Sequence, residues 1–262
     1  MAVTWHNHES CGFVVLNNPP VNAINHNMRE GLISAVKWAE REKLKRVILS
    51  GSGRGFAAGA DTKEFDHPPV SPHLPDVINC IEASTVPWIA AIHGAALGGG
   101  GELALGCRYR IARADATIGF PEVILGLVPG AGATQRLPRL IGLKEALKLI
   151  PTGKTISGRA AMAIGLVDAI DDDPINAAKL IDQKILSELV PLNLTKAGAD
   201  ETVNYDAARQ IAIRRMRGQE APLTSISLLE MAQTATFDDG MKKERTAFLA
   251  LRASSQARAL RH

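Results

Sequence analysis

The chain has 262 residues and a formal net charge of +3, with 46% hydrophobic and 4% aromatic residues. The hydrophobic fraction is ordinary for a globular protein and argues against disorder. The small charge and the scarcity of aromatics disfavour a nucleic-acid partner, because neither a basic stripe nor a stacking platform is present. A mild positive excess still suits a small phosphorylated ligand.

The cysteine pattern and the two ends of the sequence indicate in which cellular compartment the protein is expected. Cys11, Cys80 and Cys107 are odd in number and widely spaced, which gives neither a disulfide framework nor a zinc signature, so no metal site is expected. The first residues lack the basic and apolar regions of a signal peptide. No stretch reaches the ~18 apolar residues of a membrane span, and the last residues carry no peroxisomal Ser-Lys-Leu address. We therefore expect a cytoplasmic protein without a membrane partner.

The first half of the chain predicts an α/β core. Apolar spacing at Met28, Leu32 and Val36 indicates a helix. Short apolar runs closed by turn residues predict strands on both sides of it and further along. These runs cover residues 12–16, 46–50, 86–93 and 109–112. Strands separated by helices in this order are typical of an α/β fold.

After about residue 151 the pattern becomes helical. Helices are predicted over residues 160–165, 175–190, 207–217, 223–235 and 240–260. Asp238 and Asp239 are candidate N-caps of the last helix. There is no internal repeat or low-complexity linker. The sequence thus predicts a core over residues 1–190 and a helical C-terminal region over residues 191–262.

Three glycine-rich segments could approach a ligand closely. In residues 51–56 the third glycine falls one position early for a dinucleotide fingerprint, and a P-loop lysine is absent, which favours a flexible strand exit. The small residues of 56–61 leave backbone N–H groups free for a ligand, although a tight turn fits equally well. The four glycines 98–101 precede a helical pattern and favour an anion or oxyanion site over close helix packing alone.

Two acids adjoin such segments. Glu102 directly follows the four glycines, and Glu122 lies in an apolar run. Taken singly, Glu122 is more typical of a solvated edge residue. If it is buried, desolvation would raise its pKa and make it a proton donor, whereas a helix N-terminus would keep Glu102 ionised. His93 lies in an apolar run and is typical of a satisfied core histidine.

Together these segments resemble the crotonase, or enoyl-CoA hydratase/isomerase, superfamily from about residue 14 to residue 167. The order and spacing of the motifs make the match specific. The motifs that carry the resemblance are residues 18–23 (Asn-Pro-Pro-Val-Asn-Ala), 55–61, 94–104, and 119–122 continuing to 126–135. Residues 105–112 and 251–260 resemble most the N-terminal hydratase part of bifunctional enoyl-CoA hydratase/3-hydroxyacyl-CoA dehydrogenases. No dehydrogenase part follows, and both a stand-alone relative and a part of a bifunctional enzyme fit.

The resemblance implies a fold of β-β-α turns forming a spiral, with a helical C-terminal region used for binding and assembly. It implies an oxyanion hole from the backbone amides of Ala60 and Gly99, with Glu102 and Glu122 as catalytic acids. Coenzyme A would be part of the substrate, so no separate cofactor is expected. Homotrimers or hexamers are typical of the family, and bifunctional relatives are often monomeric. Substrate contacts are expected at Val21, Ala23, Ala58, Ala60, Asp61, Lys243 and Phe248.

The expected activity is hydration of a trans-2-enoyl-CoA thioester in fatty-acid β-oxidation, in which Glu102 activates water and Glu122 protonates Cα. A Δ3,Δ2-enoyl-CoA isomerase is the first alternative, because it needs the same oxyanion hole but only one carboxylate. Other thioester reactions on this scaffold, such as hydrolysis or decarboxylation, and a non-catalytic acyl-CoA-binding protein are further alternatives. Acyl chain length is left open, although the Pro-rich residues 65–75 could line an acyl pocket.

Overall fold

A computed structural model of the chain describes residues 1–198 and 201–261. It contains two compact units. The first comprises Met1–Ile118 and Ile156–Pro191, and the second comprises Gly119–Thr155 and the chain from Leu192 onward. This division groups an internal segment with the C-terminal helices. It therefore differs in kind from the continuous parts 1–190 and 191–262, which stay a prediction.

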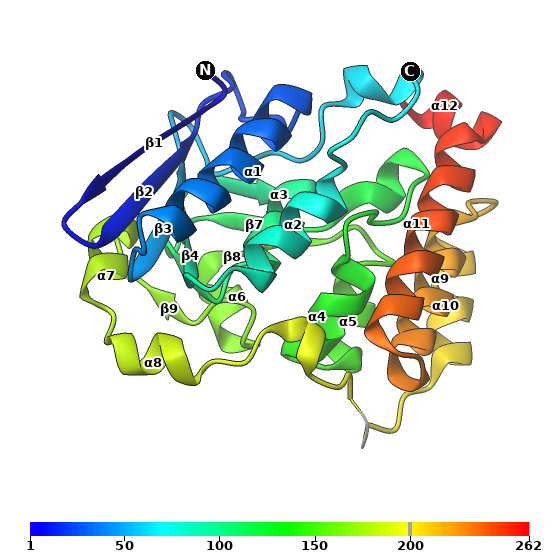
Figure 1. The fold of residues 1–262 in the computed structure, drawn as a ribbon. Coiled ribbons are helices and arrows are strands. Elements are labelled where there is room, and N and C mark those ends of the chain that lie inside the picture. Colours follow the sequence, from blue (N-terminus) through cyan, green and yellow to red (C-terminus); the bar gives the residue numbers. More distant parts are fainter. Residues whose placement is uncertain (199–200, 262) are drawn as a thin grey trace. The chain divides into compact units, whose positions relative to one another are not determined.

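The first unit is built on a six-stranded sheet with the order β1-β2-β3-β4-β6-β9 (Figure 1). β1 pairs antiparallel with β2, and the remaining neighbours are parallel. All four predicted strands are confirmed, while β1 and β9 were not predicted. The strands are β1 (Val3–His8), β2 (Cys11–Leu16), β3 (Arg46–Gly51), β4 (Trp88–Ile92), β6 (Tyr109–Ala112) and β9 (Ala169–Ile170).

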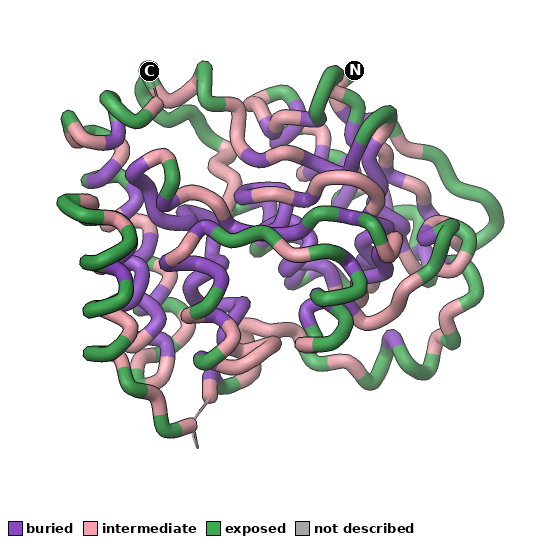
Figure 2. The backbone as a smooth tube through the Cα atoms, turned by 180° about the vertical axis from the view of Figure 1, so that it is seen from behind, coloured by how far each residue is buried: buried purple, intermediate pink, exposed green. Residues whose placement is uncertain are grey.

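Helices cover both faces of this sheet. Successive strand residues point to opposite faces. A methyl group on Gly12 would lie 3.1 Å from the Trp38 ring of α1 (His26–Arg41), whereas Lys179 of α7 (Pro174–Leu180) lies over the ring of Phe13. The central strands are consequently buried, as Figure 2 shows. This arrangement confirms the predicted α/β core.

Shorter elements of the first unit carry the glycine-rich segments. β5 (Ala95–Leu97) belongs to a second sheet of order β5-β7-β8, with β7 (Thr117–Gly119) and β8 (Thr155–Ser157). The helices are η1 (Thr62–Asp66), α2 (Leu74–Ala83), α3 (Gly99–Leu105), α6 (Gly158–Ala163) and α8 (Gln183–Glu188). The helix predicted over 175–190 is split into α7 and α8, because the Asp182 side chain accepts the Lys184 N–H and starts a new helix.

The second unit is helical. Two predicted helices are confirmed, while the one predicted over 240–260 is divided into α11 and α12. The elements are η2 (Pro121–Leu125), α4 (Ala133–Ile141), α5 (Leu143–Leu149), η3 (Leu192–Leu194), α9 (Tyr205–Arg215), α10 (Ala221–Thr234), α11 (Phe237–Ala253) and α12 (Ser255–Arg261).

The predicted N-cap of the last long helix was wrong. Thr236 is the N-cap of α11, because its backbone is extended and its side chain accepts the Asp239 N–H. Asp238 and Asp239 lie in the first turn instead, where acidic side chains complement the helix dipole. The helix therefore starts earlier than its apolar spacing indicates.

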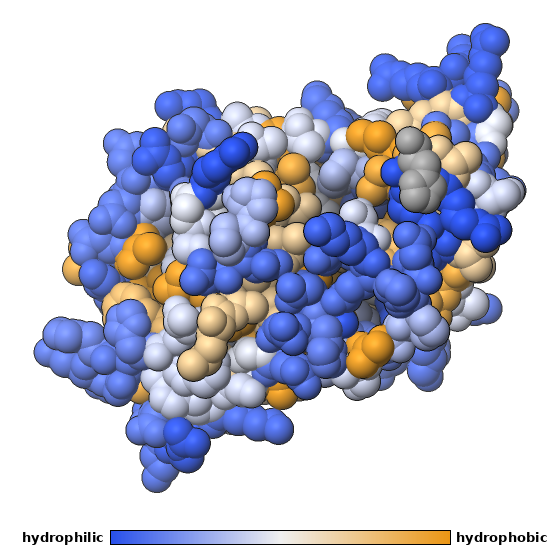
Figure 3. Space-filling model, turned by 90° about the horizontal axis from the view of Figure 1, so that it is seen from above, coloured by the Kyte–Doolittle hydropathy of each residue, from blue (hydrophilic) through white to orange (hydrophobic). Residues whose placement is uncertain are grey.

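The surface shown in Figure 3 is mainly hydrophilic, and its hydrophobic residues occur in small groups. Within residues 1–198 and 201–261, no helix is long and apolar enough to cross a membrane.

Candidate active site

Residues 21–24 run alongside residues 58–61 in the first unit. The Ala58 N–H donates to the Val21 carbonyl at 3.0 Å, and the Ile24 N–H donates to the Gly59 carbonyl at 2.8 Å. The Asp61 N–H donates back to the Ile24 carbonyl at 3.2 Å. Five of the predicted substrate-contact residues are thereby brought onto two neighbouring backbones: Val21, Ala23, Ala58, Ala60 and Asp61.

A second contact joins residues 57–60 to β5 and α3. The Ala57 N–H donates to the Ala95 carbonyl, and the Leu97 N–H donates to the Ala57 carbonyl, both at 2.9 Å. Gly100 lies so close that a methyl group on its Cα would sit 2.1 Å from the Ala57 oxygen. Only glycine fits at this approach. The glycines at 98–101 thus serve close packing as well as the chemistry predicted for them.

The amides of Ala60 and Gly99 lie near each other. Gly99 is the first residue of α3, so its N–H has no partner within the helix. A methyl group on Gly99 would lie 3.2 Å from the Ala60 nitrogen. The pairing with Ile24 uses the groups flanking Ala60, so the Ala60 N–H faces away from Ile24. Two amide donors side by side can stabilise a developing oxyanion.

Glu102 is buried one turn after this pair. Glu102 is 3% exposed, and its N–H donates to the Gly98 carbonyl at 2.9 Å. Gly98 has a φ of 50°, a conformation that favours glycine. The sequence placed all four glycines ahead of the helix, whereas Gly99 to Gly101 form its first turn. The turn is therefore slim enough to bring Glu102 into the packed part of the unit.

Glu122 lies in η2 of the second unit and is half-buried. Its carbonyl accepts the Leu127 N–H at 3.1 Å. Val123 takes the buried position in this turn, while Ile124 is exposed. Of the two acids, Glu102 is therefore the more buried, and Glu122, for which burial was the condition of a raised pKa, is only half-buried.

The side chains of Asp61, Lys243 and Phe248, which are predicted substrate contacts, lie in different surroundings. The Asp61 side chain accepts the Lys63 N–H at 3.1 Å and caps η1. Lys243 is exposed on α11. The Phe248 ring is buried against Gly130, where an added methyl group would lie 2.5 Å from it. In the structure, Phe248 thus has a packing role within the second unit.

Residues 51–56 form the end of β3 and the turn that follows it, and His93 contacts this turn. Gly51 ends β3 and the chain turns away without opening a helix, as expected for a strand exit. His93 is half-buried, and its Nε2 lies 3.1 Å from the Gly53 carbonyl oxygen. The histidine therefore belongs to this turn and has a hydrogen-bond partner.

Asn22 belongs to the 18–23 motif, and the sequence did not indicate the structural role of its side chain. Asn22 is 1% exposed with a φ of 54°. Its side-chain amide donates to the carbonyls of Ser52 and Gly55 at 2.9 Å and of Phe56 at 3.2 Å. It thereby holds the entry to the 57–60 segment. Asparagine tolerates the left-handed region better than most residues, and this preference was the available signal.

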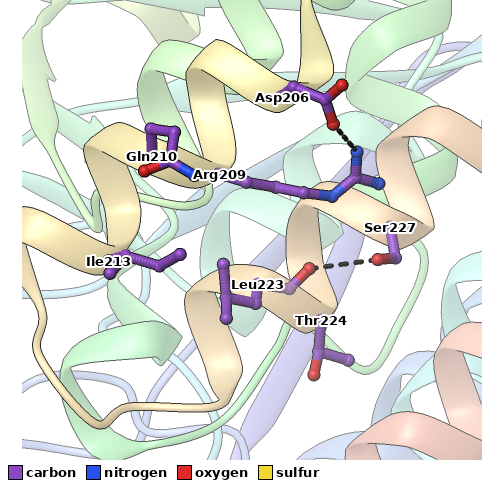
Figure 4. A pocket seen from close by; sticks show the side chains of 7 residues that line it. All are labelled: Asp206, Arg209, Gln210, Ile213, Leu223, Thr224 and Ser227. Carbon is purple, nitrogen blue, oxygen red and sulfur yellow. Dashed lines mark hydrogen bonds and ion pairs between the residues drawn. The ribbon is translucent and has the colours of Figure 1, made fainter.

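A hollow of about 640 Å³ lies between α9 and α10 of the second unit (Figure 4). Arg209 in its wall pairs with Asp206 at 3.1 Å and also with Glu230. None of the predicted site residues lines this hollow, which is therefore separate from the chemistry predicted here. Within the described part of the chain, no group of three or more His, Cys, Asp or Glu side chains could hold a metal ion.

Residues 6–215 match the family described as Enoyl-CoA hydratase/isomerase. The peroxisomal bifunctional enzyme of Cavia porcellus is 40% identical over 266 residues, covering 97% of this chain and 36% of the relative. The predicted likeness to bifunctional enzymes is thus confirmed. This chain spans little more than a third of their length.

Two further relatives have hydratase names. The Bacillus subtilis protein "Probable enoyl-CoA hydratase" is 44% identical over 162 residues, covering 59% of this chain and 63% of that protein. The crystal structure of enoyl-CoA hydratase from Thermoplasma volcanium matches with a TM-score of 0.65 and 28% identity, covering 99% of this chain and 95% of that one. The predicted crotonase-like spiral fold is confirmed by this likeness.

Proposed function

Because the chain belongs to the enoyl-CoA hydratase/isomerase family, we propose that it adds water across the 2,3 double bond of a trans-2-enoyl-CoA thioester in fatty-acid β-oxidation. One observation carries the proposal. The amides of Ala60 and Gly99 lie together, with the buried carboxyl of Glu102 one turn further along α3. An oxyanion site next to an acid is the arrangement that addition to a conjugated thioester requires.

The amide pair acts on the thioester carbonyl. Both N–H groups donate to its oxygen, which polarises the conjugated double bond. As water adds at Cβ, negative charge moves to the oxygen and an enolate develops. Fixed amide donors stabilise that charge without reorganising, so their effect is larger in the transition state than in the bound substrate.

The two glutamates move the protons. Glu102 takes a proton from water as it attacks Cβ, and Glu122 delivers a proton to Cα of the enolate. The backbones of 21–24 and 58–61 would line the path of coenzyme A. Exposed Lys243 is available for its phosphates, because a lysine ammonium pairs with phosphate oxygens.

Isomerisation of a 3-enoyl-CoA is the second candidate activity. It needs the same amide pair and one carboxylate to carry a proton between carbons. The presence of both Glu102 and Glu122 favours hydration as the main reaction and is compatible with isomerisation as a second one. A purely acyl-CoA-binding protein would need neither acid. Assembly as a homotrimer or hexamer and a cytoplasmic location stay predictions, since relatives include proteins named as peroxisomal.

The test follows the loss of enoyl absorbance when the protein is mixed with crotonyl-CoA. Glu102→Gln and Glu122→Gln are each expected to lower turnover by roughly 10²–10⁴. Glu188→Gln is the matched control, because Glu188 is an exposed glutamate on α8, and it should keep wild-type turnover. Near-normal hydration by either site variant would remove that residue from the mechanism. A wild-type protein that isomerises a 3-enoyl-CoA but leaves crotonyl-CoA unchanged would overturn hydration in favour of isomerisation.

A further inference from the structure

We propose that Glu244 is a positioning residue for Glu122, because it fastens the segment that follows η2 to the C-terminal helix α11. The inference rests on the proposed function and concerns the second unit alone. Glu244 is a fully buried carboxyl that the hydration mechanism does not use.

The Glu244 carboxylate binds the start of α4. One oxygen accepts the Gly132 N–H at 2.6 Å, and the other accepts the Thr134 N–H at 2.9 Å and the Thr134 hydroxyl at 2.7 Å. Gly132 is the N-cap of α4 and has no side chain to cap the helix itself. The first N–H groups of a helix need acceptors, and Glu244 supplies one from a helix 110 residues away in the sequence.

Further contacts extend this attachment along the same two segments. A methyl group on Gly132 would lie 3.0 Å from the Met241 sulfur, one on Gly130 would lie 2.5 Å from the Phe248 ring, and one on Gly126 would lie 3.0 Å from the Ala257 Cα. Residues with increasing numbers, from 126 to 132, contact residues with decreasing numbers, from 257 to 241. At these three positions the segment thus runs antiparallel to α11 and α12.

The N-terminal end of the 126–132 segment contacts η2, the turn that contains Glu122. The N–H groups of Gly126 and Leu127 both point to η2, and each donates to the Glu122 carbonyl. Gly126 is also the residue that packs against Ala257. The backbone of Glu122 is therefore connected to Glu244 through the short segment up to Thr134, which contacts α11 and α12 at Gly126, Gly130 and Gly132.

Removing the charge of Glu244 should loosen this connection. A glutamine at 244 keeps the size of the side chain but has one oxygen acceptor in place of two. Three donors from Gly132 and Thr134 now compete for that oxygen, and the glutamine NH₂ group, itself a donor, faces a backbone N–H. The buried amides are then left poorly satisfied, which favours displacement of the segment. A proton donor displaced by about 1 Å can lose on the order of 10² in rate, so a partial displacement should cost about tenfold.

The experiment measures hydration of crotonyl-CoA by Glu244→Gln in the wild-type and Glu122→Gln backgrounds. We expect kcat to fall about tenfold with KM nearly unchanged, and no further fall in the Glu122→Gln background. Thr134→Val removes one of the three hydrogen bonds to Glu244, together with the one that the Thr134 hydroxyl accepts from Gln135. It should show the same pattern with a smaller loss. If Glu244→Gln does not fold, Thr134→Val carries the test by itself.

Ser225→Ala is the control for general destabilisation. Ser225 is fully buried on α10, and its hydroxyl donates to the Pro222 carbonyl at 2.7 Å. This variant should lower Tm while leaving kcat unchanged. An unchanged kcat in both Glu244→Gln and Thr134→Val, or an equal loss with and without the Glu122 carboxyl, would overturn the positioning role. Full activity of Glu122→Gln would instead remove Glu122 from the proposed mechanism, and a wild-type protein that leaves crotonyl-CoA unchanged would overturn the proposed function.

Discussion

Gly99 lies so close to Ala60 that a methyl group on its Cα would come within 3.2 Å of the Ala60 amide nitrogen. The two residues are 39 positions apart in the sequence, by their numbers, and the pairing of Ala57 with Ala96 brings them together. The structure thus places two backbone amides side by side. The donors need no side chain, so substitutions at these positions act through geometry alone.

Gly99→Ala should therefore impair catalysis without removing an amide. The added methyl group would meet the Leu74 side chain at 2.8 Å and crowd the Ala60 N–H. We expect kcat/KM for crotonyl-CoA to fall by about 10²–10³, the usual cost of losing one oxyanion donor. Gly218→Ala is the control: Gly218 has space around it, its φ of 75° strains an alanine locally, and none of the predicted site residues is near it in the sequence. It should keep wild-type kcat/KM. More than half of the wild-type activity in Gly99→Ala would contradict the assignment.

The fold was largely predictable because β2, β3 and β4 are apolar runs that end at or near asparagine or glycine. β1 was missed because polar residues dominate Val3–His8 and only its first residue is buried. β9 is two residues long, too short to carry a pattern. Helix ends were also missed, since Thr236 and Asp182 act through side-chain hydrogen bonds that spacing does not reveal.

The site was predictable only in part, and for a different reason. Ala60, Gly99 and Glu102 lie in motifs whose order and spacing are specific. Asn22 lies in the 18–23 motif, which gives no role to its side chain, and Glu244 lies in no such motif. Their importance depends on carbonyls and amides more than 30 and more than 100 residues away, respectively. Only the folded chain brings those partners together.

Asn22 offers a test of how the 57–60 segment is held. Asn22→Gly keeps the left-handed backbone but loses the amide's hydrogen bonds to three carbonyls, and should lower the free energy of unfolding by about 1–3 kcal/mol. Asn22→Ala adds backbone strain and should cost about 1–2 kcal/mol more. Urea unfolding of both variants checks this order. Equal stabilities of the two variants would show that the backbone conformation carries no cost.

The three cysteines should differ in reactivity. Burial raises the pKa of the Cys107 thiol to about 12. Partial burial raises the pKa of exposed Cys80, with Asp76 adding to it, and burial raises that of Cys11 against the charges of Arg46 and Lys179. A raised thiol pKa lowers the reactive thiolate fraction at a given pH.

We therefore expect iodoacetamide to label Cys80 first, and Cys107 only after unfolding in urea. Below the thiol pKa, each pH unit should speed Cys80 labelling about tenfold, because the thiolate fraction rises tenfold. Peptide mass spectrometry of time points at pH 7 and pH 8 measures both effects. Labelling of Cys107 in the folded protein at a rate similar to that of Cys80 would show that the α3 region opens readily.

The start of α11 can be tested with two neighbouring substitutions. Thr236 caps the helix by accepting the Asp239 N–H at 3.1 Å, and its hydroxyl donates to the Asp239 carboxylate at 2.8 Å. Thr236→Ala should lower the free energy of unfolding by about 1 kcal/mol. Asp238→Ala removes only a charge near the helix N-terminus and should cost about 0.3–1 kcal/mol at low salt, falling as salt screens the dipole. Urea unfolding at two salt concentrations separates the cases. Most of the Thr236 loss should persist at high salt, because the capping hydrogen bond from the Asp239 N–H joins two neutral groups and is screened little. If the loss for Asp238→Ala were the larger and salt-independent one, Asp238 rather than Thr236 would begin the helix.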